Sequence, residues 1–225
     1  MSRRPSALAC ALVFAHLAGA ACSTNTVEPE PDPDPTDAGA PVDELGARST
    51  KNHLVWKRAR AFEQGLGQAL LLSKDEVCQE LGRASCVDDV HLVALGGNDP
   101  FLQGMHEPLA EPTATTPVAV ERIALAACSK SVEKDAQNPV PLLFLDLDLR
   151  ADAPAFVLDD ESAALAAGDA ARRVGQRLLA RDLTEGEVAR LLSLRTDDAG
   201  APVTPRTYAV AMCFALATLS ENVFY

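Results

Sequence analysis

The sequence predicts a mostly all-α fold, a single disulfide-stapled helical bundle over residues 48–225 with at most one short extended segment. Three observations predict it. Capping signals recur in front of apolar stretches of helical spacing, and four cysteines fall within the same region. Only residues 140–149 alternate apolar and polar side chains with a period of two. A region of this length suffices for one core and is marginal for two domains.

The expected helices begin at recognisable start signals. Ser73 and Glu76 form a capping box, in which each residue can satisfy a backbone N–H of the other. Thr184 and Glu187 form a second one. Thr-Pro pairs at 116–117 and 204–205 place a hydroxyl cap before a proline of the first turn. The helices are expected over residues 52–70, 74–81, 88–95, 117–136, 160–180, 185–194 and 205–219.

The last of these helices, residues 205–219, is apolar on every face and too short to span a bilayer, which predicts burial at the centre of the bundle. Residues 98–116 contain three prolines and little periodicity, so a long ordered loop is expected there. Residues 140–149 predict an extended segment with Leu145, Leu147 and Leu149 on one face. Since a lone strand has no partner, this segment could pair in a sheet or lie on helices.

Residues 1–21 have the composition of an export signal peptide. Arg3 and Arg4 precede an apolar run of about 15 residues, which is too short to cross a bilayer of roughly 30 Å as a helix. Cys22 follows two alanines, and this ending resembles the lipobox of bacterial lipoproteins. The resemblance implies that Cys22 is acylated and becomes the mature N-terminus. The alternative is cleavage after Ala20 by the ordinary signal peptidase, which would leave Cys22 as a spare thiol.

Residues 22–47 would then form a tether between the lipidated cysteine and the domain. This stretch alternates proline with Asp and Glu and contains almost no apolar residue, so it cannot bury a core and is expected to be disordered. Proline favours the polyproline II conformation, which limits the reach to about 75 Å at ~3.1 Å per residue. The tether is therefore expected to hold the helical domain off the membrane.

The remaining cysteines agree with export. If Cys22 carries lipid, the four cysteines of the domain can pair completely, as is usual in an oxidising compartment. These are Cys78, Cys86, Cys128 and Cys213. Four cysteines allow three connectivities. Cys78 and Cys86 are close enough for a local bridge, whereas a bridge between the apolar helices of Cys128 and Cys213 would join the two halves of the domain.

Charge limits the classes of partner. The formal net charge is −12, and because phosphate binding needs a basic face, nucleic acid is not an expected partner. One basic stripe is the candidate face for an anionic partner or a lipid head group, and it consists of Arg172, Arg173, Arg177 and Arg181. The alternative is a hydrated face whose arginines pair with neighbouring acids.

No catalytic, cofactor or metal motif is recognisable. The sequence lacks GxSxG, HExxH, P-loop, GxGxxG and CxxCH patterns, and its four histidines have no paired ligand spacing. Asp146, Asp148 and Asp152 could suggest calcium, but the glycine and the terminal acid of an EF-hand loop are missing, which favours a solvated edge. We therefore expect no cofactor and no metal site.

Part of the C-terminal half resembles a known exported module. Residues 171–194, ARRVGQRLLARDLTEGEVARLLSL, resemble the "RRPLT-x-x-E" segment of cytochrome-associated exported proteins first noted in planctomycetes, and the closing ALATLSENVFY is similar to the aromatic ending of that module. The resemblance implies a helical fold and an exported setting. Asp182 stands where the module has an Arg-Pro pair and no haem motif accompanies it, so an electron-transfer role is not implied.

These features together predict a lipoprotein of the cell envelope, anchored at a membrane that faces the periplasm or the cell surface, with a non-enzymatic binding or assembly role. Its expected partners are membrane lipid, through Cys22, and an envelope protein. One alternative is an accessory subunit of a periplasmic redox complex that contains a cytochrome. The other is an enzyme whose site is assembled only in space.

Overall fold

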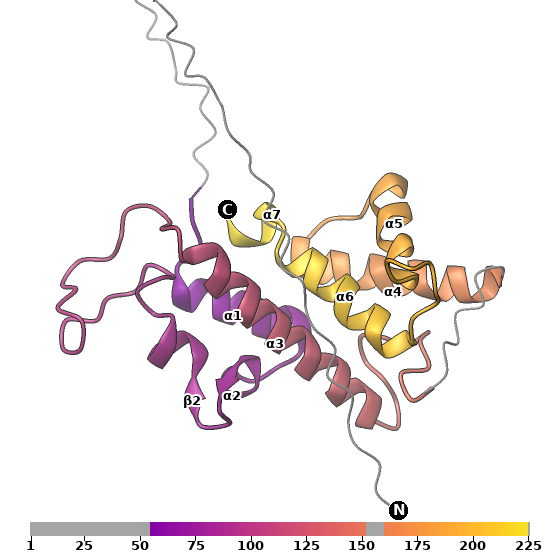
Figure 1. Cartoon of the computed structure of the whole chain (residues 1–225), viewed down its shortest axis with the longest axis horizontal. Coiled ribbons are helices and arrows are strands. Elements are labelled where there is room, and N and C mark those ends of the chain that lie inside the picture. The colour runs from indigo at the N-terminus through magenta and orange to yellow at the C-terminus, as the bar shows by residue number, and fades with distance from the viewer. Residues whose placement is uncertain (1–54, 152–159, 225) are drawn as a thin grey trace, which may run out of the picture. The chain divides into compact units, whose positions relative to one another are not determined.

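The computed structural model describes residues 55–151 and 160–224 (Figure 1). The export signal, Cys22, the tether and Asp152 lie outside the described residues. The described residues are mostly helical, as the sequence predicts. The elements are α1 (Ala59–Leu70), α2 (Lys74–Val77), β1 (Gln79–Glu80), β2 (Ala84–Ser85), the π-helical turn η1 (Cys86–Val90), α3 (Thr116–Gln137), α4 (Glu161–Leu179), α5 (Glu185–Leu192), the 3-10 turn η2 (Ser193–Arg195), α6 (Pro205–Ala217) and α7 (Ser220–Val223).

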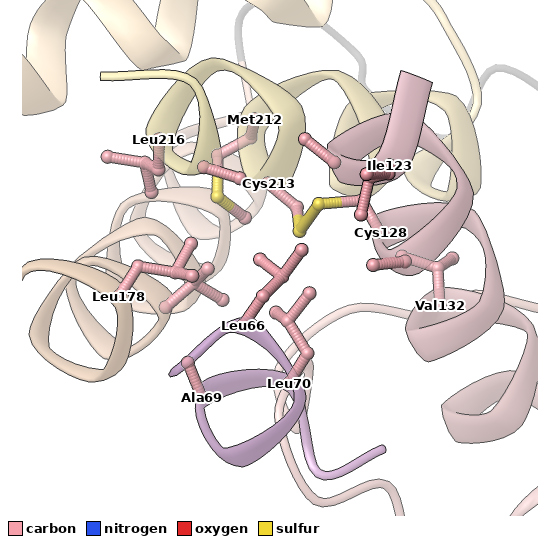
Figure 2. Packing of buried hydrophobic residues seen from close by; sticks show 14 of the residues in the cluster. Leu66, Ala69, Leu70, Ile123, Cys128, Val132, Leu178, Met212, Cys213 and Leu216 are labelled. Atoms are coloured by element: carbon pink, nitrogen blue, oxygen red, sulfur yellow. A yellow bond between two sulfur atoms is a disulfide. The ribbon is translucent and has the colours of Figure 1, made fainter. Parts of the chain in front are cut away.

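The core forms where α1, α3, α4 and α6 meet. The α6 helix packs against both α3 and α4, and α1 packs against the same two helices. Figure 2 shows Leu66 and Leu70 of α1 pointing toward Met212 of α6 and Ile123 of α3, and all four side chains are buried. One face of α6 therefore lies in the core, whereas Val210, Phe214 and Ala215 on its other face are half-buried, so the helix is not enclosed on every side as its composition predicts. Among the helices of the described ranges, none has the length and hydropathy that a transmembrane span requires.

Two disulfides cross-link the domain. One joins Cys128 of α3 to Cys213 of α6 inside the core, where both residues are fully buried (Figure 2). The other joins Cys78 to Cys86 across the short antiparallel hairpin of β1 and β2. Of the three possible connectivities, the structure thus has one local bridge and one that links distant helices.

Three of the predicted start signals, those at Ser73, Thr184 and Thr204, cap helices in the structure, and Asp160 caps a fourth. The capping boxes of Ser73 and Thr184 open α2 and α5. The side chain of Asp160 accepts from the Ser162 N–H at the start of α4, and that of Thr204 accepts from the Thr207 N–H at the start of α6.

The predicted cap at Thr116 is wrong by one residue. The cap position of α3 is Thr115, and Thr116 is the first helical residue. The Thr116 hydroxyl is buried and donates instead to the Ala94 carbonyl at 2.6 Å. The Thr116 hydroxyl therefore makes a tertiary hydrogen bond and does not cap the helix, although the local sequence pattern predicts that it does.

Helix α1 begins later than predicted. Residues 55–58 are not helical, because the backbone at Trp56 forms a bridge with Phe224 and the Lys57 N–H donates to the Val223 carbonyl at 2.9 Å. Pairing with the C-terminal end of the described chain therefore replaces the first turns of the expected helix.

The helices predicted over 74–81 and 88–95 are also shorter. Cys78 is already extended, and the chain turns through Leu81 and Gly82, both at positive φ, into β2. In place of the second helix, η1 ends at Val90 and turns follow it as far as Gly96, at φ +73°. The hairpin that the Cys78–Cys86 bridge closes leaves no room for a longer α2.

Residues 140–149 form turns and no strand, so the predicted period-two face is wrong. Leu147 and Leu149 are buried, but Leu145 is 49% exposed. The buried carboxylate of Asp135, on α3, accepts the backbone N–H groups of residues 142, 143 and 144 at 2.8 Å each. These bonds satisfy N–H groups that a strand would have given to a neighbouring strand, and the segment lies on the helices.

Candidate functional site

The four arginines of the predicted partner face each have acceptors within the chain. Arg172 bonds to Glu185 at 3.0 Å and Arg173 to Asp146 at 2.9 Å. Arg177 donates to the carbonyls of Gln68 and Ala69 at the end of α1. These contacts connect α4 to three other parts of the chain, and an external anion would have to compete with them.

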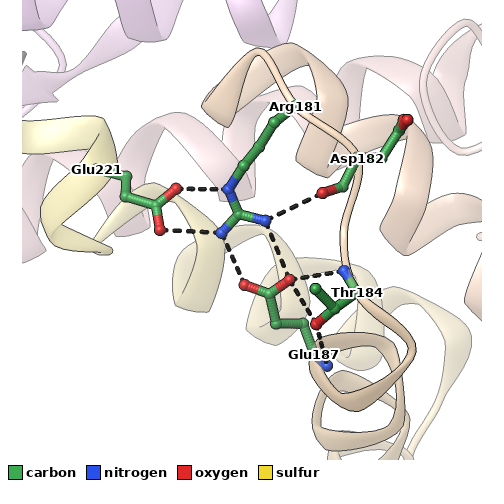
Figure 3. A network of polar contacts seen from close by, with 5 residues as sticks. All are labelled: Arg181, Asp182, Thr184, Glu187 and Glu221. Carbon is green, nitrogen blue, oxygen red and sulfur yellow. Dashed lines mark hydrogen bonds and ion pairs between the residues drawn. The ribbon is translucent and has the colours of Figure 1, made fainter.

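Arg181 is the most extensively bonded of the four (Figure 3). Its guanidinium pairs with Glu187 of α5, with a shortest distance of 2.7 Å, and with Glu221 of α7, with Nε–Oε2 also 2.7 Å. It donates in addition to the Asp182 carbonyl. The hydrogen bonds from Arg181 lower the pKa of Glu187 to about 2 and also lower the pKa of Glu221. From the turn that follows α4, Arg181 thus joins α5 to α7.

A cavity of about 330 Å³ lies between α1 and α2. Its lining residues are Arg60, Glu63, Gln64, Gly67, Gln68, Leu72, Lys74 and Val77. Those from α1 recur every three or four positions and so share one face of the helix. The chain leaves α1 through Leu71, in the left-handed conformation at φ 56°, and this turn brings α2 beside that face.

Glu63 is a buried carboxylate in this cavity. It is only 6% exposed, and in the described part of the chain no hydrogen bond or ion pair reaches it. The other buried polar side chains, those of Thr116, Ser131, Asp135 and Asn222, all have hydrogen-bond partners. Among these five buried polar residues, Glu63 is therefore the one whose side chain makes no hydrogen bond in the described chain, although its carboxylate oxygens are not among the fully enclosed unbonded atoms, which are Trp56 Nε1, His91 Nε2 and Arg195 Nη1.

The surroundings of Glu63 disfavour its charge. Burial raises the pKa of the Glu63 carboxyl, the positive charge of Lys74 partly opposes this, and the negative charge of Asp88 adds to it. Arg60 and Asp75 have smaller effects of opposite sign. Lys74 is itself hydrogen-bonded to Asp88, so its charge is already shared with another carboxylate.

The rim of the cavity carries polar side chains that make no hydrogen bond within the described chain. They are the side chains of Arg60, Gln64 and Gln68, while Leu72 and Val77 supply apolar surface.

No known protein family, characterised protein or solved structure matches the chain. The chemistry of the site is therefore inferred from its own groups. These are the Glu63 carboxylate inside the cavity and, around the opening, the Arg60 guanidinium and the Gln64 and Gln68 amides. The described residues contain no group of three or more His, Cys, Asp or Glu side chains placed to hold a metal ion.

The sequence contains an indication that Glu63 is buried, but a search for functional motifs does not detect it. Ala59, Phe62, Leu66 and Leu70 form the apolar stripe of α1, and Glu63 falls within it at helical spacing from Ala59 and Leu66. A carboxylate on an apolar stripe indicates a buried charge. The α2 residues that line the cavity with Glu63 could not be named before the left-handed turn at Leu71 was known.

Proposed function

We propose that this chain is a lipid-anchored envelope protein whose helical domain binds a small ligand and does not transform it. The observation that carries the binding role is Glu63, which is buried at a cavity and makes no hydrogen bond within residues 55–151 and 160–224. An unsatisfied buried acceptor lowers stability by roughly 1–3 kcal/mol, and more for a charged group. Such a cost is typical of binding sites, because a ligand that supplies the missing donors recovers it.

The cysteines support the anchor. With Cys78 bonded to Cys86 and Cys128 to Cys213, Cys22 is the only cysteine left outside the expected signal peptide. Acylation at Cys22 would then leave no thiol unused, as expected of an exported protein. The proline-rich tether would allow the domain to reach ligands at a distance from the membrane.

The cavity lining favours binding over catalysis. General acid–base or nucleophilic chemistry needs at least two cooperating groups within hydrogen-bond reach of the reacting atoms. The lining holds one carboxylate, one guanidinium, which stays protonated, and one ammonium, which is bonded to Asp88. It contains no Ser, Cys, His or Tyr that could serve as a nucleophile or proton carrier.

Two measurements test this proposal. Cell fractionation of Cys22→Ser should move the protein from the membrane to the soluble fraction, and mass spectrometry of the wild type should find an acylated Cys22. An unmodified Cys22 in a mature, membrane-released chain would refute the anchor.

For the binding role, the full chain in mild detergent is melted with and without a deproteinised extract of the cell envelope. The extract should raise the melting temperature of the wild type and of Glu121→Gln, which alters an exposed glutamate of α3, but not that of Glu63→Gln. An equal rise in all three proteins, or no rise in any, contradicts a binding role for this cavity.

A further inference from the structure

Resting on the binding role proposed above, we infer the class of ligand: a small molecule with a protonated amine and a nearby carboxylate or carbonyl, such as an amino acid or short peptide. The ammonium group would donate to the Glu63 carboxylate. The acceptor end would take the guanidinium of Arg60, and an apolar side chain would lie against Leu72 and Val77.

The charges around Glu63 favour a cationic group over a neutral donor. The attraction of Glu63 to Lys74 and Arg60 is opposed by its repulsion from Asp75 and Asp88, and Lys74 is already bonded to Asp88, so the negative charge of an ionised Glu63 has no cation bonded to it in the described chain. A neutral hydroxyl or amide could donate a hydrogen bond but would leave that charge uncompensated in a buried place. An ammonium group supplies both the donors and the charge, and the resulting bond is of the stronger, charge-assisted type.

Arg60 fits the other end of such a ligand. It precedes Glu63 by three residues, so both side chains lie on one face of α1 and line the same cavity. Its guanidinium has no hydrogen-bonded acceptor in the described part of the chain, and its planar donors match a carboxylate. The amides of Gln64 and Gln68 can bond to a peptide group between the two ends.

The size of the cavity limits the ligand. About 330 Å³ is near the lower end of the range of roughly 300–1,000 Å³ for small-molecule sites. Gly67 allows the turn and α2 to pack closely on α1 at this wall of the cavity, since a Cβ there would stand 3.2 Å from the Leu72 carbonyl and 3.3 Å from Val77. An amino acid or dipeptide therefore fits better than a longer peptide.

Calorimetry on the full chain, purified in a non-ionic detergent, tests the inference with three probes: L-leucine, L-leucinamide and N-acetyl-L-leucine. Leucine should bind, and N-acetyl-leucine, which lacks the ammonium group, should bind at least about tenfold more weakly, as expected for the loss of a hydrogen bond to a charged group. Leucinamide keeps the ammonium group and should retain most of its affinity for Glu63.

Two variants assign the ends. Glu63→Gln should weaken leucine and leucinamide alike by at least about tenfold. Arg60→Gln should weaken leucine more than leucinamide, because only leucine has the carboxylate. Glu121→Gln is the matched control and should bind all probes as the wild type does, and circular dichroism checks that each variant is folded.

The inference fails if N-acetyl-leucine binds as tightly as leucine, if folded Glu63→Gln binds leucine undiminished, or if the wild type binds neither leucine nor leucinamide. In that last case, an envelope extract that still stabilises the wild type in a Glu63-dependent way would overturn only the amine class. If the extract also has no effect, the binding role falls together with it.

Discussion

Replacing Glu63 by leucine is expected to stabilise the domain. The residue is 6% exposed, lies within the apolar stripe of α1, and has no hydrogen bond in the described chain. Leucine fits the same stripe and is as good a helix former as glutamate. The variant therefore removes a buried, unsatisfied charge without changing the local backbone preference.

The size of the stabilisation expected for Glu63→Leu follows from the surroundings of Glu63. Removing a buried acceptor that lacks a donor recovers about 1–3 kcal/mol. The attraction of Glu63 to Lys74 and Arg60 is lost as well, but both cations are exposed and solvent screens them. We expect a net gain of about 1–2 kcal/mol, which in a domain of this size corresponds to a rise in melting temperature of roughly 2–8 °C.

The pH dependence of this gain identifies its cause. Because the pKa of Glu63 is raised above its ordinary value of 4.5, the folded wild type binds more protons than the unfolded chain at pH values between 4.5 and the folded-state pKa. The stability of the wild type therefore falls as the pH rises from 4.5 through the folded-state pKa, whereas leucine does not titrate. The advantage of Glu63→Leu should be small below that window and complete above it.

Urea unfolding of the full chain at pH 4 and pH 7, for the wild type and Glu63→Leu, measures this difference. A variant that is less stable than the wild type at pH 7, or an advantage that is the same at both pH values, would show that Glu63 is satisfied in the folded protein. Glu121→Leu, an exposed position of α3, should stay within about 0.5 kcal/mol of the wild type at both.

Three further perturbations test the framework. Removing the Cys128–Cys213 bridge by a double alanine substitution should lower the free energy of unfolding by about 4–5 kcal/mol, and removing Cys78–Cys86 should lower it by about 2–3 kcal/mol. The difference is expected because loop-closure entropy grows with the sequence separation, which is 85 residues for the first bridge and 8 for the second. Equal losses in urea unfolding would contradict this. Arg181→Gln should lower the melting temperature at pH 7, and the difference from the wild type should shrink as the pH falls from 4.5 toward 2, where Glu187 becomes protonated; a constant difference would exclude the ion pair as its source. Gly96→Ala should cost at least about 2 kcal/mol, because alanine is strained at φ +73° and its Cβ would stand 2.7 Å from Trp56, whereas Gly82→Ala, at φ +70° in open space, should cost only about 1 kcal/mol in the same assay.

Features that depend on neighbours in the sequence could be predicted. The capping boxes that begin at Ser73 and Thr184 involve residues three positions apart, and the structure has both. The apolar composition of α6 likewise predicted that the helix contributes to the core, although the structure buries only one of its faces. In these cases the physical cause lies within one turn or one helix, so no knowledge of the fold was needed.

Features that depend on residues distant in the sequence could not be predicted. The start of α1 depends on the bond between Lys57 and Val223, near opposite ends of the described chain. The irregular path of residues 142–144 depends on the Asp135 carboxylate of another element. Glu63 has a local signal, but its meaning depends on the placement of α2. Alternation or spacing in the sequence cannot identify such partners before the chain is folded.

The predicted arginine face and the Glu63 cavity are parts of one arrangement. Arg177 of α4 donates to the carbonyls of Gln68 and Ala69, which belong to the last turn of α1, where the helix supplies no further N–H donors. Gln68 also lines the cavity. The arginine therefore holds the cavity-bearing end of α1 against the bundle.

The opposite wall is held in a comparable way. Lys134 of α3 donates to the Leu71 carbonyl at 3.1 Å and to the Glu76 carboxylate at 2.8 Å, and this bond lowers the pKa of Glu76 to about 2. Lys134 thus fixes the turn that sets α2 beside α1. The two walls of the cavity are thus anchored to separate helices, α4 and α3. Anchoring of this kind holds the side chains that line the cavity in place for a ligand.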